Sequence, residues 1–167
     1  MLRLSWLISI GISLFGVMII EHFFSLSPEG VANGGNLGAV GIALIIPFIL
    51  LSLITTFRYF TEATRNFNDN ILKVILIIAG IGLIVVTAYY ANEYKNEVYA
   101  SLGGTTKDVT SIIYGFPTLN EYTNRIFINF YTFAFVHTIS AVAGGIFAMV
   151  KPKKEIENQE DNHLKIE

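Results

Sequence analysis

The most constraining feature of the chain is an apolar run, GAVGIALIIPFILLSLITTF, which occupies residues 38–57 and contains no charged residue. A helix on the surface of a water-soluble protein has charged or polar residues on its solvent face, so its apolar positions recur every three or four residues. This run shows no such recurrence. A helix of about 20 residues crosses a hydrocarbon core of about 30 Å. The run is therefore predicted to span a membrane.

Three further segments are long and apolar enough to do the same, Leu4–Phe24, Lys73–Ala91 and Ile126–Val150. Of the 167 residues 53% are hydrophobic and 14% are charged, whereas roughly 25% are charged in a soluble domain. Too few polar residues remain to wrap four such segments as a soluble core. We expect an all-α polytopic membrane protein, with a four-helix transmembrane domain over residues 1–150 and a charged cytoplasmic tail over residues 151–167.

The basic residues are divided unequally between the two sets of loops, and short loops rich in Lys and Arg stay in the cytoplasm. One set contains Arg3, Arg58, Arg65, Lys73, Lys151, Lys153, Lys154 and Lys165, and the other contains Lys95, Lys107 and Arg125. This division predicts that both termini are cytoplasmic, and we expect the membrane to be a bacterial inner membrane. An outer loop of about 30 residues, over positions 95–125, then joins the third and fourth helices.

The outer loop has room for structure of its own. Val109, Ile112 and Ile113 are spaced to form one apolar edge of a short helix, although a loosely ordered connector fits the sequence equally well. Thr118 and Glu121 have the spacing of a capping box, which satisfies the first free N–H groups of a helix. We therefore expect the fourth helix to begin there, outside the bilayer, and to run for about 30 residues.

Several kinds of chemistry are excluded by what the sequence lacks. It has no cysteine, and the net charge is −2, so thiolate metal sites and bulk attraction to nucleic acid are both excluded. No cluster of His, Asp and Glu has metal-ligand spacing, and no glycine-rich phosphate loop is present. We expect no catalytic residue, no metal, no cofactor and no direct binding of nucleic acid.

His137 lies near the middle of the fourth segment, where an ionisable side chain in lipid is costly, so it should face protein or water. Its neighbours at helical spacing are small, Ala134, Ala141 and Gly144. One hypothesis makes His137 a proton relay or a pH-sensitive hinge. The other, which we favour, is a neutral imidazole that hydrogen-bonds to a neighbouring helix and holds it in place.

Three further residues are candidates for a polar path or a hinge. Asn129 lies eight residues before His137 and flanks the same helix face. Glu21 lies beside His22 at the outer end of the first segment, where the pair would either gate a vestibule or simply meet water. Pro47 removes one backbone hydrogen bond from the second segment and permits a kink.

Two more features suggest contacts with other proteins. Ser140, Gly144 and Ala148 form a stripe of small residues that lets two helix backbones approach closely, which predicts helix packing and self-association into a homo-oligomer. The tail changes abruptly to mixed charge, which is typical of a solvated or partner-binding segment. We expect it to dock a cytosolic protein through Glu155, Glu157, Glu160, Asp161 and Lys165.

The layout of four spans, one substantial outer loop and a charged cytosolic tail is similar to that of the membrane subunits of some bacterial phage-defence systems, the Kiwa membrane subunit among them. The likeness is one of architecture, and no sequence motif accompanies it. It implies a role in antiviral defence.

The leading functional hypothesis is a non-enzymatic inner-membrane protein that self-associates in the lipid bilayer and acts as a sensor or anchor for a cytosolic partner. The alternative is a small oligomeric ion channel or proton-linked transporter. The two differ in where the polar side chains point. A path needs them to converge on a hydrated cavity, whereas an anchor needs only pairwise hydrogen bonds between helices.

Overall fold

A computed structural model describes residues 1–31 and 35–151 of the chain. The described residues form helices and connecting turns, with no strand among them. The helices are α1 (Leu2–Phe23), α2 (Leu37–Arg65), α3 (Asn70–Ser101), α4 (Asn124–Phe127) and α5 (Phe130–Val150). Four spans, of which the last combines α4 and α5, are long and apolar enough to cross a membrane.

The four apolar segments predicted from the sequence are helical over nearly all of their length, with one break at residues 128–129, which confirms that part of the prediction. Two of the helices continue past their apolar runs, so that α2 has 29 residues and α3 has 32. At 1.5 Å per residue each exceeds the roughly 30 Å of a hydrocarbon core. Both start at a side-chain cap, since Asn36 accepts a hydrogen bond from the Ala39 N–H and Asp69 accepts one from the Ile71 N–H.

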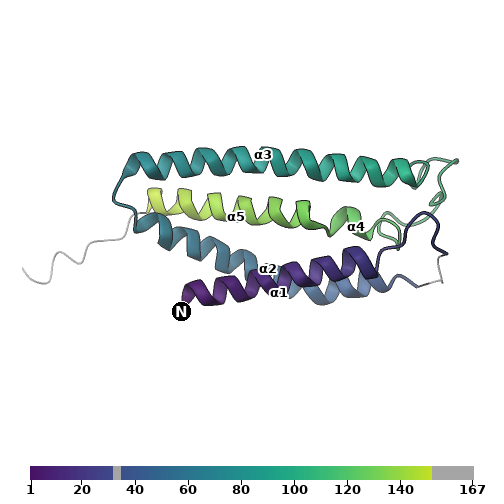
Figure 1. The fold of residues 1–167 in the computed structure, drawn as a ribbon, viewed down its shortest axis with the longest axis horizontal. Helices are drawn as coiled ribbons and strands as arrows, with labels where there is room; N and C mark the ends of the chain where they lie inside the picture. Colours follow the sequence, from purple (N-terminus) through teal and green to yellow (C-terminus); the bar gives the residue numbers. More distant parts are fainter. Residues whose placement is uncertain (32–34, 152–167) are drawn as a thin grey trace, which may run out of the picture.

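The long helices lie side by side, with α5 between α2 and α3, and with α1 packed on α2 (Figure 1). The N-terminus, the α2–α3 turn and the end of α5 lie together, and we call this the terminal end of the bundle. The two longer loops meet at the opposite end, which we call the loop end. In this arrangement α5 runs parallel to α2 and antiparallel to α3.

Most large apolar side chains of the four spans point outward. On α3, for example, Ile71, Ile78 and Val85 are all more than 60% exposed. Such a surface would not be stable in water, since large contiguous patches of exposed apolar side chains mark contact with a membrane or a partner. The outward-facing apolar side chains therefore fit a bundle whose solvent is lipid.

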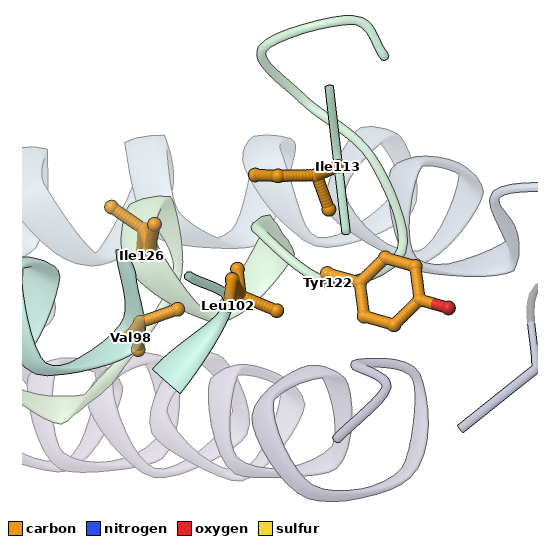
Figure 2. Close-up of a cluster of buried hydrophobic side chains, with 5 residues drawn as sticks. All are labelled: Val98, Leu102, Ile113, Tyr122 and Ile126. Carbon is orange, nitrogen blue, oxygen red and sulfur yellow. The ribbon is translucent and has the colours of Figure 1, made fainter. Parts of the chain in front are cut away.

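The largest buried apolar cluster lies at the loop end, outside the centre of the bundle. Figure 2 shows Val98 near the end of α3, Leu102 directly after α3, Ile113 and Tyr122 from the following loop, and Ile126 from α4 converging on one another. The two longer loops are also joined directly, because the Tyr122 hydroxyl donates to the Gly30 carbonyl at 2.7 Å. The loop end is thus a folded cap.

The prediction of a helix edge formed by Val109, Ile112 and Ile113 is wrong. These residues lie in successive turns, and they point in different directions, since Ile113 is fully buried while Val109 is 78% exposed. The alternative of a loose connector does not describe the loop either. Ser111 holds the turns together by donating to the carbonyls of Leu102 and Gly104.

The predicted start of the fourth helix near Thr118 and Glu121 is also wrong. The Thr118 carbonyl accepts a hydrogen bond from the Thr123 hydroxyl, and residues 118–123 form turns. A capping box does occur, but it lies further along the chain. The Asn129 side chain accepts from the Thr132 N–H at 3.0 Å, and the Thr132 hydroxyl accepts from the Asn129 N–H at 3.1 Å. The last span is thereby broken into α4 and α5.

Candidate functional site

His137 lies in the interface between α5 and α2, and both of its ring nitrogens have a partner. The Ser52 hydroxyl lies 2.7 Å from Nε2, and the Phe133 carbonyl lies 2.8 Å from Nδ1. A carbonyl can only accept, so Nδ1 donates to it. The single proton of the Ser52 hydroxyl is shared between Nε2 and the Ile49 carbonyl of its own helix, which lies 2.8 Å from the hydroxyl oxygen. In the neutral Nδ1–H tautomer both ring nitrogens lie within hydrogen-bond distance of a protein group, and the side chain is buried.

The rest of the α2–α5 interface carries two more hydrogen bonds between helices. The Ser140 hydroxyl donates to the Leu53 carbonyl at 2.7 Å. One turn further on, the single proton of the Thr61 hydroxyl is shared between the Gly144 carbonyl at 3.1 Å and the Phe57 carbonyl of its own helix at 2.8 Å. Each bond joins one side chain to one group on the facing helix.

The α1–α2 interface is built in the same way. The Ser9 and Thr55 hydroxyls lie 2.7 Å apart, and the Trp6 indole N–H donates to the Thr56 hydroxyl at 3.0 Å. The Trp6 ring also stacks on Tyr59, with ring centroids 4.1 Å apart. Hydroxyls of α2 therefore connect it to both of its neighbours, α1 and α5.

The stripe of Ser140, Gly144 and Ala148 packs inside the subunit. Gly144 and Ala148 are buried, Ser140 bonds to α2, and a Cβ added at Gly144 would overlap the Phe57 carbonyl oxygen. The close helix approach that the sequence predicted at this stripe occurs between α5 and α2 of one chain. Self-association was expected through the same face, and that face is already occupied.

The other candidates for a polar path have separate partners and lie on different elements. The Glu21 carboxylate accepts from the Tyr94 hydroxyl at 2.9 Å, which ties α1 to α3 at the loop end. Asn129 caps α5 and donates to the Arg125 and Ile126 carbonyls. Pro47 lies on the exposed side of α2, which continues through it as one helix.

These candidates form no shared network with His137 among the described residues. The residues expected to dock a partner, Glu155, Glu157, Glu160, Asp161 and Lys165, lie outside the described part of the chain. No group of three or more His, Asp or Glu side chains in the described ranges is arranged to hold a metal ion.

Sequence reasoning missed the partners of these candidates. Ser52 was not singled out, although the hydroxyl residues Ser52, Thr55 and Thr56, at i, i+3 and i+4, form a polar stripe on the otherwise apolar run of residues 38–57. Asn36 and Asn124 were missed as well. Their amide side chains exchange two hydrogen bonds at the loop end, and Asn124 is completely buried. The stripe was detectable from spacing, whereas the asparagine pair, 88 positions apart, was not.

Comparison of the chain with protein-family models, with curated proteins and with solved structures found no match.

Proposed function

We propose that the chain is a non-enzymatic, multi-pass protein of a bacterial inner membrane that acts as an anchor and sensor for a cytosolic partner. The observation that carries the proposal is the closed pairing of His137 with Ser52 and the Phe133 carbonyl. A proton path needs a histidine with a nitrogen open to water or to the next relay group. Here the imidazole is used to hold two helices together.

The remaining polar contacts inside the bundle support the same function. Hydroxyls and carbonyls are joined across α1–α2 and α2–α5, and two cavities between the helices have an almost wholly apolar lining. One of these cavities, of about 220 Å³, lies among Val17, Ile49 and Phe133. Pairwise hydrogen bonds of this kind are typical of helices that pack permanently in lipid.

In this proposal the folded cap at the loop end faces the periplasm and the terminal end faces the cytoplasm, as the distribution of Lys and Arg predicts. The cap is coupled to α3 through Val98 and Leu102, so that a change in the cap would reach the membrane helices. The tail after Lys151 would carry the cytosolic partner. A place in a phage-defence system is part of the proposal and rests on the layout of the chain.

Ion and proton flux separates this function from that of a channel or transporter. The purified protein is reconstituted into liposomes that contain a pH-sensitive dye, and a pH step is applied. Since His137 is closed off, we expect wild-type liposomes to leak no faster than empty ones, and His137→Gln liposomes to behave identically. Flux through the wild type that disappears in His137→Gln would overturn the proposal in favour of a proton path.

The anchoring role is tested by a chain that ends at Lys154, which keeps the basic residues at the end of the last helix. The truncated chain should insert into the membrane as the full chain does and should lose its cytosolic partner in a pull-down from the native host. A control chain with the tail charges kept but their order scrambled tests for sequence-specific docking. If the truncated chain retains the partner and the biological activity, the tail is no docking segment.

A further inference from the structure

A cavity of about 460 Å³ opens at the terminal end of the bundle, between α1, α2 and α5. Leu2 of α1 and Phe147 of α5 line two sides of it. The third side is a single stripe of α2, formed by Arg58, Thr61, Glu62 and Arg65. These four residues follow the i, i+3, i+4, i+7 spacing that places side chains on one face of a helix. The two arginines are seven residues apart, which corresponds to about 10.5 Å along the axis.

Further positive charge surrounds the cavity. Arg3 lines a hollow of about 190 Å³ that shares Leu2 and Glu62 with it. The Lys151 Nζ lies 5.4 Å from the centre of the Phe147 ring. Glu62 is the one carboxylate that lines either hollow in the described part of the chain. The surroundings therefore favour an anion.

Arg65 is also held in place on the cavity wall. The Arg65 guanidinium donates to the Lys151 carbonyl at 2.9 Å, and its Cζ lies 5.8 Å from the centre of the Phe147 ring. A guanidinium presents several N–H groups in a fixed plane and binds phosphate oxygens in a bidentate manner. With one arm of Arg65 fixed, its position over the cavity is set before any ligand arrives.

The depth of the cavity identifies the source of the anion. Phe57 is the last residue of the charge-free run of α2, and Arg58 is the first charged residue after it. The cavity thus lies at the boundary between hydrocarbon and headgroups. The aromatic rings of Trp6 and Tyr59 stack nearby at the same end of the bundle, as interfacial aromatic belts do. Phe57 and Phe147, with centroids 5.6 Å apart, supply apolar surface beside the charges.

We propose that this cavity binds the phosphate of an anionic phospholipid between Arg58 and Arg65, with an acyl chain lying against Phe57 and Phe147. Basic pockets between membrane helices bind anionic headgroups by the same combination of charge and apolar wall. Lipid binding at this cavity does not depend on which leaflet surrounds the terminal end. The lipid proposal can therefore be correct or wrong independently of the proposed anchor function.

The test measures lipid binding to the full chain in detergent by native mass spectrometry. Phosphatidylglycerol should bind more tightly than phosphatidylcholine, and the variant Arg58→Gln/Arg65→Gln should bind phosphatidylglycerol at least about tenfold more weakly. Arg58→Gln alone serves if the double variant does not fold. Phosphatidylglycerol binding that is unchanged in these variants would overturn the proposal, as would equal binding of the two lipids.

Two matched variants and one soluble anion complete the design. Lys73→Gln removes a basic charge from the same end of the bundle but outside the cavity, so it should leave binding unchanged. Glu62→Gln removes the carboxylate between the arginines and should tighten binding. Inorganic phosphate at the same concentrations should neither bind nor compete with the lipid. If it protects the chain from thermal unfolding as well as phosphatidylglycerol does, the site is one for soluble anions and the lipid assignment is wrong.

Discussion

Gly144 of α5 packs directly on the backbone carbonyl of Phe57 in α2, and the Gly144 carbonyl in turn accepts the hydroxyl of Thr61. A Cβ at position 144 has no room, because the obstructing atom belongs to a helix backbone. We predict that Gly144→Ala pushes α5 away from α2 and lowers the free energy of unfolding by about 1–3 kcal/mol. Equilibrium unfolding in SDS, followed by the fluorescence of Trp6, measures this change.

Gly82 provides the matched control, because a Cβ added there meets no atom within 4 Å. Gly82→Ala should leave stability unchanged or raise it slightly through its better helix propensity. Equal stability of the two alanine variants would show that α5 and α2 are further apart than described. If Gly144→Ala instead formed a smaller oligomer than the wild type and kept its stability, the face of α5 that carries Gly144 would be a contact between subunits.

The orientation in the membrane is tested with single cysteines, which are clean probes because the chain has none. Ser27→Cys and Val109→Cys at the loop end should react with an impermeant thiol reagent applied to intact cells, and Asn68→Cys in the α2–α3 turn should react only after lysis. All three side chains are exposed. Thr64 in the same region is a poor probe, since it is buried and would stay silent on either side. The reverse labelling pattern would invert the predicted topology.

Asp108 predicts a pH response in the cap. The N–H of Thr105 and, second, its hydroxyl donate to the carboxylate at 2.6 and 2.7 Å, which lowers the pKa of Asp108 below its ordinary value of 3.8. The turn is therefore fully stabilised above that value and loses stabilisation as the pH falls through the lowered pKa. An NMR titration of the carboxyl carbon should show this pKa.

Thr105→Val separates the two causes of the Asp108 shift. The valine keeps the shape of the side chain and the backbone N–H but removes the hydroxyl. The pKa should rise only part of the way to its ordinary value, because the backbone hydrogen bond is the larger cause. A pKa that does not move would mean that the Thr105 hydroxyl contributes nothing to the turn.

The four spans were predictable because each depends on a local property of about 20 consecutive residues, namely the absence of charge. The break at Asn129 was not predictable in the same way. Thr118 and Glu121 have the spacing of a capping box, and so do Asn129 and Thr132. Which of the two pairs starts the helix depends on the apolar residues that the folded cap at the loop end can bury. Ile113 and Ile126 meet Leu102 in that cap, and contacts at such separations leave no local pattern.

The candidate site was predictable only in part for a similar reason. The position of His137 within an apolar segment indicates that it must face protein, and the structure provides Ser52 as its partner. The small-residue stripe likewise indicates close packing. Neither pattern says whether the facing helix belongs to the same chain, because the same close approach serves an intrachain and an interchain contact equally well.

Asn124 provides the last prediction, since it locks the loop end together without contact with solvent. Its amide Nδ2 donates to the Asn36 Oδ1, and its Oδ1 accepts from the Asn36 Nδ2 at 3.2 Å. The Asn124 Nδ2 also donates to the Phe24 carbonyl at 3.4 Å. Asn124→Asp is nearly isosteric but turns both contacts of Nδ2 into contacts between oxygens, and it places a charge in a fully buried position. We predict a loss of about 2–5 kcal/mol in the free energy of unfolding and faster hydrogen exchange throughout the cap. Asn36→Asp is the matched control, because an aspartate there still accepts from Asn124 and from the Ala39 N–H that it caps, so it should cost clearly less. Equal losses in the two variants would show that the loss comes from the introduced charge and not from the direction of the two hydrogen bonds.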